Sequence, residues 1–332
     1  MILVLRALGV GDLATAVPAL RGLRAAFPDQ EVALAVPDWL APLVDLIGCV
    51  DRVVPTDGLT PREWGIPSPY LAVNLHGQGP QSHQLLLAAD PQRLGAFACP
   101  AADHHDGPHW DPDEHEVLRW CRLLAWYGIA ADPTDLGLRR PSPHRVPVGV
   151  TIVHPGAKAV GKRWAPGRFA ALARELTGQG HRVVVTGSAA ERGLAERVVS
   201  GAGLPGTSVL AGRIDLAELA ALVAHGRLVV SADTGIAHLA TAYGTPSVVL
   251  FGPVSPYRWG PPPDRPWHRT LWTQELTVPA GSSAPARAAG AGGPEPWRRD
   301  TPALASISLE SVLDAVGEAD RAGRERSAVT AK

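Results

Sequence analysis

Short apolar runs alternate with amphipathic stretches along this chain of 332 residues, and the alternation occurs in two separate series. Such a pattern is typical of parallel strands that are connected and covered by helices. In the first series, strands are predicted over residues 2–6, 32–36, 52–55, 71–75 and 93–97. Helices are predicted over residues 12–27, 39–47, 82–89 and 113–127.

The second series begins after a proline-rich stretch, residues 132–147, which we interpret as a linker. Its predicted strands are residues 148–153, 182–186, 208–210, 228–231 and 247–251, and its predicted helices are residues 166–178, 189–200, 215–224 and 235–243. Two series of this kind imply an α/β protein with two Rossmann-like domains, whose parallel sheets face a central cleft. Ligands bind such sheets at the loops that follow the carboxyl ends of the strands.

The proposed domain limits follow the same pattern. The amino-terminal domain with its linker takes residues 1–147, and the second domain takes residues 148–278. Residues 279–300 are rich in Gly, Ala and Pro without periodicity, which predicts a flexible loop. Residues 301–332 contain a predicted helix over residues 308–322, opened by Ser308, and a frayed tail after Gly323.

The composition excludes several classes of protein. Hydrophobic residues make up 45% and charged residues 19%, which is a globular rather than a disordered composition. The formal net charge of −1 argues against a nucleic-acid binder, and no apolar run reaches the roughly 20 residues of a transmembrane helix. Cys49, Cys99 and Cys121 are scattered without zinc-ligand spacing, which favours a reducing cytoplasm and no metal site.

A glycine-rich turn follows the first predicted strand. Gly9, Gly11 and Ala14 satisfy the G-x-G-x-x-A spacing of a dinucleotide-binding loop, and Asp38 follows the second strand, where an acid that binds ribose would lie. These residues make a nicotinamide- or flavin-dependent oxidoreductase an alternative for this chain. Against it, the carboxylate of Asp12 at the helix start would repel the pyrophosphate that such a loop binds.

Asp12 also suits proton transfer. Glycines let the backbone turn sharply, so that the carboxylate faces the cleft and can remove a proton from a hydroxyl group that attacks a sugar. The structural alternative is a helix cap, since Asp is favoured at the N-cap position. The sequence therefore predicts either a general base or a cap at this position.

A basic loop follows the first strand of the second series. Residues 154–164 read HPGAKAVGKRW, a glycine-bearing loop with Lys158, Lys162 and Arg163. Lys332 is the only other lysine of the chain, so two lysines within five positions indicate a site that requires an ammonium group. Cations on such a loop bind phosphate oxygens, whereas the alternative is a solvated basic loop.

Residues 229–239 read VVSADTGIAHL, a buried strand that runs into a helix. Thr234 and Gly235 would present backbone N–H groups at the helix start, which form an anion site. His238 lies one turn further along and can reach the same ligand. The structural alternatives are Asp233 as a cap and His238 as a packed helical histidine.

Four histidines gather in one segment near several aspartates: His104, His105, His109 and His115. Their spacing matches no compact zinc pattern, and proline and glycine interrupt the segment. We interpret it as a polar loop.

The three motifs occur in an order that resembles one known family. Residues 11–20 (Gly-Asp-x5-Pro-Ala-Leu), residues 154–164 (His-Pro-Gly-x5-Lys-Arg-Trp) and residues 231–239 (Ser-x-Asp-Thr-Gly-x2-His-Leu) together resemble the heptosyltransferase-like glycosyltransferases of family 9. Residues 115–129 and 251–253 are similar to that family as well. The resemblance covers residues 1–272.

This resemblance implies a GT-B fold and a metal-independent, inverting transfer of a sugar of the heptose type from an ADP-sugar donor, with no cofactor. By resemblance, Asp12 is the general base and Lys162 neutralises the donor phosphates. Lys158 lies where relatives carry a small or hydroxylated residue, and we assign it to the donor site too. The family residues that contact diphosphate and sugar are matched here by Asp233, Thr234, Gly235 and His238.

The acceptor side matches the family less closely. Residues 74–82, NLHGQGPQS, follow its pattern only loosely, and Gly11, His76 and Gly77 are the candidates for contact with the acceptor. Typical members act on a lipid A core, whereas the composition here leaves a glycan, another lipid-linked molecule or a secondary metabolite open as acceptor. The enzyme would act in the cytoplasm, with at most peripheral membrane contact. A third interpretation, a non-catalytic nucleotide-sugar-binding relative, is disfavoured because the motif residues are intact.

Overall fold

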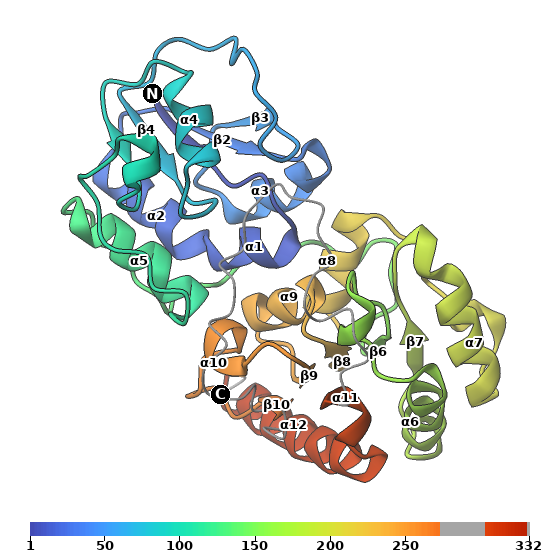
Figure 1. The fold of residues 1–332 in the computed structure, drawn as a ribbon. Helices are drawn as coiled ribbons and strands as arrows, with labels where there is room; N and C mark the ends of the chain where they lie inside the picture. Colours follow the sequence, from blue (N-terminus) through green and yellow to red (C-terminus); the bar gives the residue numbers. More distant parts are fainter. Residues whose placement is uncertain (273–302, 331–332) are drawn as a thin grey trace. The chain divides into compact units, whose positions relative to one another are not determined.

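The computed structural model of the protein describes residues 1–272 and 303–330. Contacts between residues divide the chain into two compact units, Met1–Arg139 and Arg140–Lys332, and each unit contains a five-stranded parallel sheet (Figure 1). The predicted α/β class with two parallel sheets is confirmed. The division falls before residue 147, the limit proposed from the sequence, because Arg140 already donates hydrogen bonds to the carbonyl groups of Ala224 and Tyr243.

The first sheet has the strand order β3-β2-β1-β4-β5, and every neighbouring pair is parallel. Its strands are β1 (Ile2–Leu5), β2 (Val32–Val36), β3 (Arg52–Pro55), β4 (Leu71–Asn74) and β5 (Leu94–Gly95). Strand β1 pairs with β2 on one side and with β4 on the other. The order in which the chain adds strands to the sheet therefore reverses between β1 and β4, while all strands stay parallel. Loops diverge at such a reversal and leave room for a ligand at the carboxyl edge.

Helices cover both faces of this sheet: α1 (Val10–Thr15), α2 (Val17–Ala26), α3 (Ala41–Ile47), α4 (Gln81–Leu87) and α5 (Glu116–Trp126). Leu85 and Leu86 of α4 pack into a core with Leu3 and Leu5 of β1, and α2 packs against α5 along the opposite face (Figure 1). The single helix predicted over residues 12–27 is wrong. Two helices form instead, because Pro18 has no N–H group to continue the ladder of α1.

The second sheet has the order β10-β9-β8-β6-β7, again parallel throughout. Its strands are β6 (Thr151–His154), β7 (Val183–Val185), β8 (Leu228–Ala232), β9 (Ser247–Phe251) and β10 (His268–Trp272). The reversal here lies between β6 and β8. The strand predicted over residues 208–210 is wrong: Gly206–Ser208 form a 3₁₀ turn, and only Val209 makes a bridge, to Val185.

The helices of the second unit are α6 (Pro166–Gly178), α7 (Arg192–Ala202), α8 (Leu216–Ala224), α9 (Gly235–Tyr243), α10 (Pro256–Trp259), α11 (Ala303–Ser306) and α12 (Leu309–Thr330). Buried side chains of α6, α7 and α12 share one core with the strands. Ser308 accepts a hydrogen bond from the N–H of Ser311, as expected of a helix start. The frayed tail predicted after Gly323 is wrong, because α12 continues and Arg326 donates a hydrogen bond to the carbonyl of Gly244. The loop predicted over residues 279–300 lies outside the described residues.

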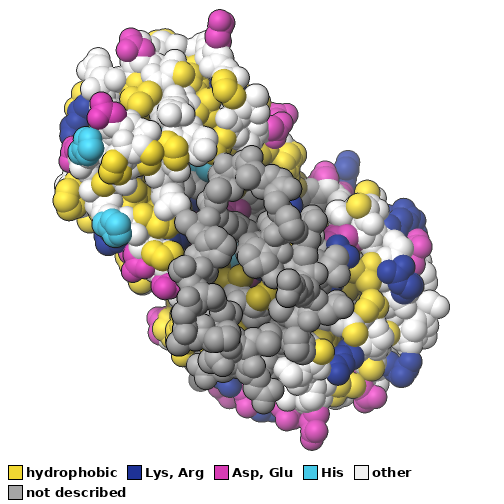
Figure 2. All heavy atoms as spheres, in the orientation of Figure 1, with side chains coloured by type: hydrophobic (Ala, Val, Ile, Leu, Met, Phe, Trp, Pro, Cys, Tyr) yellow, Lys and Arg dark blue, Asp and Glu magenta, His cyan; other side chains and the backbone are white. Residues whose placement is uncertain are grey.

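Charges of both signs are mixed on the face drawn in Figure 2, where Lys and Arg side chains lie among Asp and Glu side chains on the second unit. This mixture agrees with the net charge of −1. Within residues 1–272 and 303–330, no helix is both long and apolar enough to span a membrane.

Candidate functional site

Asp12 lies at the carboxyl edge of the first sheet, in the first turn of α1, the helix that follows β1. Helix α1 begins at Val10 with Gly9 as its N-cap, so Asp12 is the third helical residue, and the helix start predicted at residue 12 is wrong. Its carboxylate Oδ2 accepts a hydrogen bond from the N–H of Gly9 at 3.1 Å, and the side chain is 28% exposed. The carboxylate occupies the place where a dinucleotide-binding loop holds pyrophosphate, which argues against the oxidoreductase alternative.

Arg6 lies directly beneath Asp12 and is completely buried. Its Nε donates a hydrogen bond to the carbonyl of Asp12 at 2.9 Å, and its Nη2 lies 3.6 Å from Asp12 Oδ1. On the other side, Nη2 forms an ion pair with Glu116 Oε1 of α5 at 2.9 Å. Arg6 is not part of any of the three sequence motifs. The available signal was a charged residue at the end of a buried apolar strand, where an unpaired charge is very costly.

His76 follows β4, the neighbour of β1, and so reaches the same edge. Its main-chain N–H donates to Asn74 Oδ1 at 3.0 Å, and its ring Nδ1 is buried without a hydrogen-bond partner among the described residues. Burial lowers the pKa of His76 to about 4; the positive charge of Arg6 also lowers it, and the charge of Asp12 opposes both. Asp12 and an uncharged His76 therefore lie at the same edge of the first sheet.

The two glycines assigned to the acceptor side flank these residues. Gly11 is the second residue of α1, immediately before Asp12. Gly77 follows His76, and its carbonyl accepts a hydrogen bond from Asn74 Nδ2 at 3.1 Å. All four acceptor-side residues therefore lie at the reversal between β1 and β4.

Lys162 and Asp233 meet at the carboxyl edge of the second sheet. Lys162 ends the loop after β6, and Asp233 follows β8; because β6 and β8 are adjacent parallel strands, these loops meet. Lys162 Nζ lies 2.7 Å from Asp233 Oδ2, with exposed side-chain fractions of 28% and 7%. The ammonium group is thus held by a buried carboxylate while part of it faces solvent.

Helix α9 begins directly after Asp233. Thr234 is its N-cap and Gly235 its first residue. A helix leaves its first N–H groups without acceptors inside the helix, so this terminus attracts anions. His238, one turn along, packs edge to face against Trp259 of α10, with ring centroids 5.9 Å apart. A cation and a helix N-terminus at one sheet edge suit a diphosphate.

Lys158 stands apart from this arrangement. It is exposed on the loop after β6, and no ion pair that involves it is found in the part of the chain that the structure describes. The loop therefore holds one anchored and one exposed ammonium group.

A carboxylate that the motifs did not reveal lies against the same loop. Glu191 accepts hydrogen bonds from the N–H and the Oγ of Ser188, both at 2.9 Å, and a Cβ at Gly156 would collide with it. Burial raises the pKa of Glu191, but the hydrogen bonds from Ser188 and the charges of His154 and Arg163 bring it below its ordinary value. The Ser188-x-x-Glu191 spacing of a capping box was its sequence signal.

The histidine segment has structural contacts. His115 caps α5 by accepting a hydrogen bond from the N–H of Val117 at 3.3 Å, and His105 lies 3.3 Å from Asp103. His104 Nε2 lies 3.4 Å from the carbonyl oxygen of Ala96. Across the two described ranges, no group of three or more His, Cys, Asp and Glu side chains could hold a metal ion.

A family profile matches the middle and second part of the chain. The profile of glycosyltransferase family 9 (heptosyltransferase) matches residues 103–276, just over half of the chain. The chain belongs to glycosyltransferase family 9. Within this family 9 chain, the matched residues include Lys162, Asp233 and all of α9.

Two curated relatives illustrate the extent of the likeness. Lipopolysaccharide heptosyltransferase 3 of Escherichia coli is 31% identical over 122 residues, which cover 36% of this chain and 34% of that protein. Lipopolysaccharide heptosyltransferase 2 of Salmonella typhimurium is 25% identical over 298 residues, 77% of this chain and 83% of that protein. The first match thus spans only about a third of the relative's length.

The chain is also similar in fold to a solved structure. ADP-heptose LPS heptosyltransferase II of E. coli superposes with a TM-score of 0.74 and 20% identity, over 98% of this chain and 99% of that one. The GT-B fold expected from the sequence is therefore confirmed.

Proposed function

We propose that this family 9 chain transfers a heptose-type sugar from an ADP-sugar to a hydroxyl group of an acceptor, with inversion at the anomeric carbon and without a metal ion or cofactor. The observation that carries the proposal is the Lys162–Asp233 ion pair at the start of α9. The names of the relatives support the choice of sugar and nucleotide, since they are lipopolysaccharide heptosyltransferases and one is named for ADP-heptose.

In the proposed donor site, Lys162 and the N–H groups of Gly235 and Ile236 bind the diphosphate. When the bond from the anomeric carbon to the diphosphate oxygen breaks, negative charge grows on that oxygen. Fixed positive groups that face this charge stabilise the transition state more than the ground state. His238 lies one turn from the same terminus and contacts the sugar, and Lys158 adds a second cation from the loop.

In the proposed acceptor site, Asp12 is the general base. Its Oδ2 is engaged by the N–H of Gly9, whereas Oδ1 lies 3.6 Å from Arg6, beyond hydrogen-bond distance, and keeps its lone pairs. Oδ1 accepts the proton as the acceptor oxygen attacks the face of the sugar opposite the diphosphate. A new carbon–oxygen bond forms, ADP leaves, and the anomeric configuration inverts.

His76, Gly77 and Gly11 surround the acceptor hydroxyl in this proposal. The acceptor is a glycan of the lipopolysaccharide type, another lipid-linked molecule or a secondary metabolite. The buried Nδ1 of His76 is a polar atom that a hydroxyl group can pair with. We place the reaction in the cytoplasm, where the free thiols of Cys49, Cys99 and Cys121 persist.

A donor screen tests the donor assignment. ADP-heptose, UDP-, GDP- and dTDP-sugars and NAD are compared by thermal shift on the full chain. A ligand at 100 times its Kd stabilises the folded state by about 2.7 kcal/mol, so ADP-heptose should raise Tm most. Stabilisation by NAD alone would overturn the proposal.

Asp12→Asn tests the base. The variant should bind ADP-heptose like the wild type and lose about 10²–10⁴-fold in kcat, the range that general-base catalysis contributes. ADP release from ADP-heptose measures turnover, with heptose-free lipopolysaccharide or water as acceptor. A variant with near-normal kcat would show that Asp12 is not the base.

A further inference from the structure

We propose that Arg6 is a positioning residue for Asp12 and that Glu116 of α5 fixes Arg6 in place. The inference rests on the proposed function, in which Asp12 is the base. It adds a role for a buried arginine and for a helix that contributes no group to the reaction itself.

Arg6 joins its own strand, β1, to three other segments of the first unit. Its Nε donates to the carbonyl of Asp12 at 2.9 Å, and its Nη1 donates to the carbonyl of Leu75, directly before His76. Its Nη2 donates to Thr15 Oγ1 at 3.2 Å and to Glu116 Oε1 at 2.9 Å. One rigid guanidinium group thus fixes the peptide of the base, the end of β4 and the start of α5.

The guanidinium group acts on Asp12 without occupying its reactive oxygen. Nη2 is engaged by Thr15 and Glu116, and Asp12 Oδ1 stays 3.6 Å away. At that distance the charges attract each other, but no hydrogen bond takes up the lone pairs that would receive the acceptor proton. Arg6 therefore orients Asp12 and leaves Oδ1 available.

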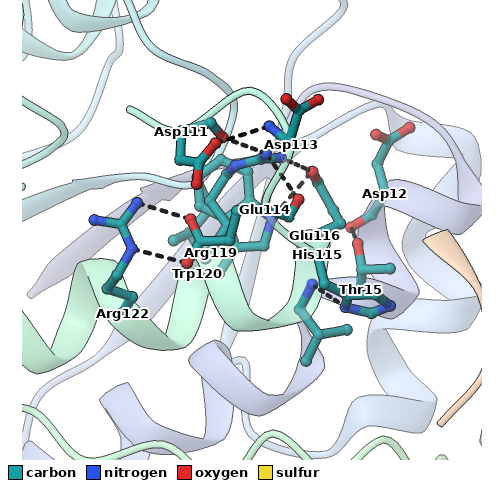
Figure 3. Close-up of polar contacts among 12 residues, drawn as sticks. Asp12, Thr15, Asp111, Asp113, Glu114, His115, Glu116, Arg119, Trp120 and Arg122 are labelled. Carbon is teal, nitrogen blue, oxygen red and sulfur yellow. Dashed lines mark hydrogen bonds and ion pairs between the residues drawn. The ribbon is translucent and has the colours of Figure 1, made fainter. Parts of the chain in front are cut away.

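Glu116 holds the arginine from the other side. Its Oε1 accepts hydrogen bonds from Arg6 and, at 3.1 Å, from Trp120 Nε1, while Oε2 pairs with Arg119. The guanidinium group of Arg6 lies over the ring of Trp120, with Cζ of Arg6 4.6 Å from the centroid of the ring. Figure 3 shows Asp12 and Thr15 beside Glu116, Arg119 and Trp120 at the start of α5. These contacts hold the guanidinium group from several sides.

The contacts also explain why the residue is arginine. Arginine presents five donors in one plane, whereas lysine presents three donors from a single nitrogen. In Arg6→Lys, a lysine at this position keeps the positive charge. Its single nitrogen cannot reach the carbonyl groups of Asp12 and Leu75 and the side chains of Thr15 and Glu116 at the same time. The variant therefore loses the orientation of Asp12 while the ion pair can persist.

A double-mutant cycle in turnover tests the inference with the full chain, ADP-heptose as donor and water as acceptor. Arg6→Lys should lower kcat by about 10–100-fold, since a misplacement of 1 Å costs about 10²-fold, and should change KM for ADP-heptose by less than about 2-fold. In an Asp12→Asn background, the same substitution should change kcat by less than about 3-fold, because a residue that acts through Asp12 has nothing left to position. Equal losses in both backgrounds would overturn the inference.

Arg24→Lys is the matched control. Arg24 lies in the same unit, donates to the carbonyl groups of Cys49, Pro28 and Gln30, and pairs with Asp51, but makes no contact with Asp12. Any loss of kcat that it causes should be the same with and without Asp12→Asn. A cycle for Arg24 as non-additive as that for Arg6 would point to general damage and overturn the inference.

Failure of the proposed function can be distinguished from failure of the proposed role of Arg6. If the wild type releases no ADP from ADP-heptose with water or with heptose-free lipopolysaccharide, the proposed function fails. The link between Arg6 and Glu116 is then decided by urea unfolding of Arg6→Lys, Glu116→Gln and the double variant. Non-additive effects support the link, and additive effects overturn it.

Discussion

Among the described residues, Lys162 has one ion-pair partner, Asp233, and in the proposed complex the donor would be a second. Its ammonium group can donate three hydrogen bonds, and Asp233 takes one of them at 2.7 Å. Because the Asp233 side chain is only 7% exposed, its carboxylate depends on Lys162 for neutralisation. The pair therefore holds the ammonium group beside the start of α9 before any ligand arrives, which lowers the ordering cost of binding.

The two lysines of the loop should differ in their effect on donor affinity. Lys162→Met should weaken ADP binding by about 10–100-fold, the value of a hydrogen bond to a charged group. Lys158→Met, which removes an exposed and unanchored ammonium group, should weaken it by less than about 5-fold, as expected of an exposed pair. Isothermal titration with ADP measures both. Equal losses in the two variants would contradict the distinction.

His76 should make the first unit sensitive to acid. Its pKa is about 4 in the folded protein against an ordinary value of 6.5, so below about pH 6.5 the unfolded chain takes up a proton that the native state does not. Stability is therefore lost as pH falls from about 6.5 to about 4. Between pH 7 and pH 5, the free energy of unfolding in urea should fall by about 2 kcal/mol more in the wild type than in His76→Leu. The same pH dependence in both proteins would exclude this contribution.

Some residues of the candidate site could be predicted from the sequence, and others could not. Lys162 and Asp233 were selected because each follows a strand and a turn, and parallel pairing of β6 with β8 brings them together. Arg6 was not selected, because its partner Glu116 lies 110 positions away and no local pattern reveals such a contact. Glu191 has a local signal in its capping box with Ser188, but no local pattern reveals that it lies against the loop at Gly156.

At the scale of elements, helix and strand cores were predictable and their ends were not. The limits of β2, β3, β9, α6 and α9 agree with the predictions. Strand β10 was missed because it is an edge strand whose Arg269 and Thr270 are exposed, so it shows no continuous apolar run. The extension of α12 past Gly323 depends on contacts with residues 244–246, which the helical pattern does not contain.

Alanine substitutions at two helical glycines, Gly22 of α2 and Gly193 of α7, should change the stability of the protein in opposite directions. At Gly22 a Cβ would lie 2.6 Å from the carbonyl oxygen of Ala130, whereas at Gly193 in α7 the nearest atom is 3.8 Å away. Gly22→Ala should destabilise the protein by about 1–3 kcal/mol through overpacking. Gly193→Ala should stabilise it by about 0.5–1 kcal/mol, because alanine loses less backbone entropy. Urea unfolding measures both, and a stabilised Gly22→Ala would show that the backbone near residue 130 yields.

At the scale of the whole molecule, each unit places its proposed site at the reversal of its own sheet. Asp12 and His76 lie at the reversal between β1 and β4, and Lys162 and Asp233 at that between β6 and β8. The first edge offers a carboxylate and a neutral imidazole, and the second offers positive groups. This division of chemistry between units is the basis for assigning acceptor and donor.

Metal removal should leave turnover intact. In the proposed donor site, Lys162 and the start of α9 provide the positive charge that many diphosphate sites obtain from Mg²⁺. ADP release from ADP-heptose should therefore change by less than about 2-fold in excess EDTA. Addition of Mg²⁺ to the treated enzyme is the control, and a loss in EDTA that Mg²⁺ restores would contradict metal independence.

The long helix α12 has a consequence for synthesis on the ribosome. Val312, Ala315 and Ala319 lie in the same core as Val153 of β6 and Phe169 of α6. The second unit therefore cannot close its core until residue 319 has emerged, whereas the first unit has all its residues by Arg139. During translation the first unit can fold as soon as it appears, whereas the strands of the second sheet keep apolar surface exposed until α12 has been synthesised. We therefore expect the second unit to be the part of the chain more prone to aggregate before synthesis ends.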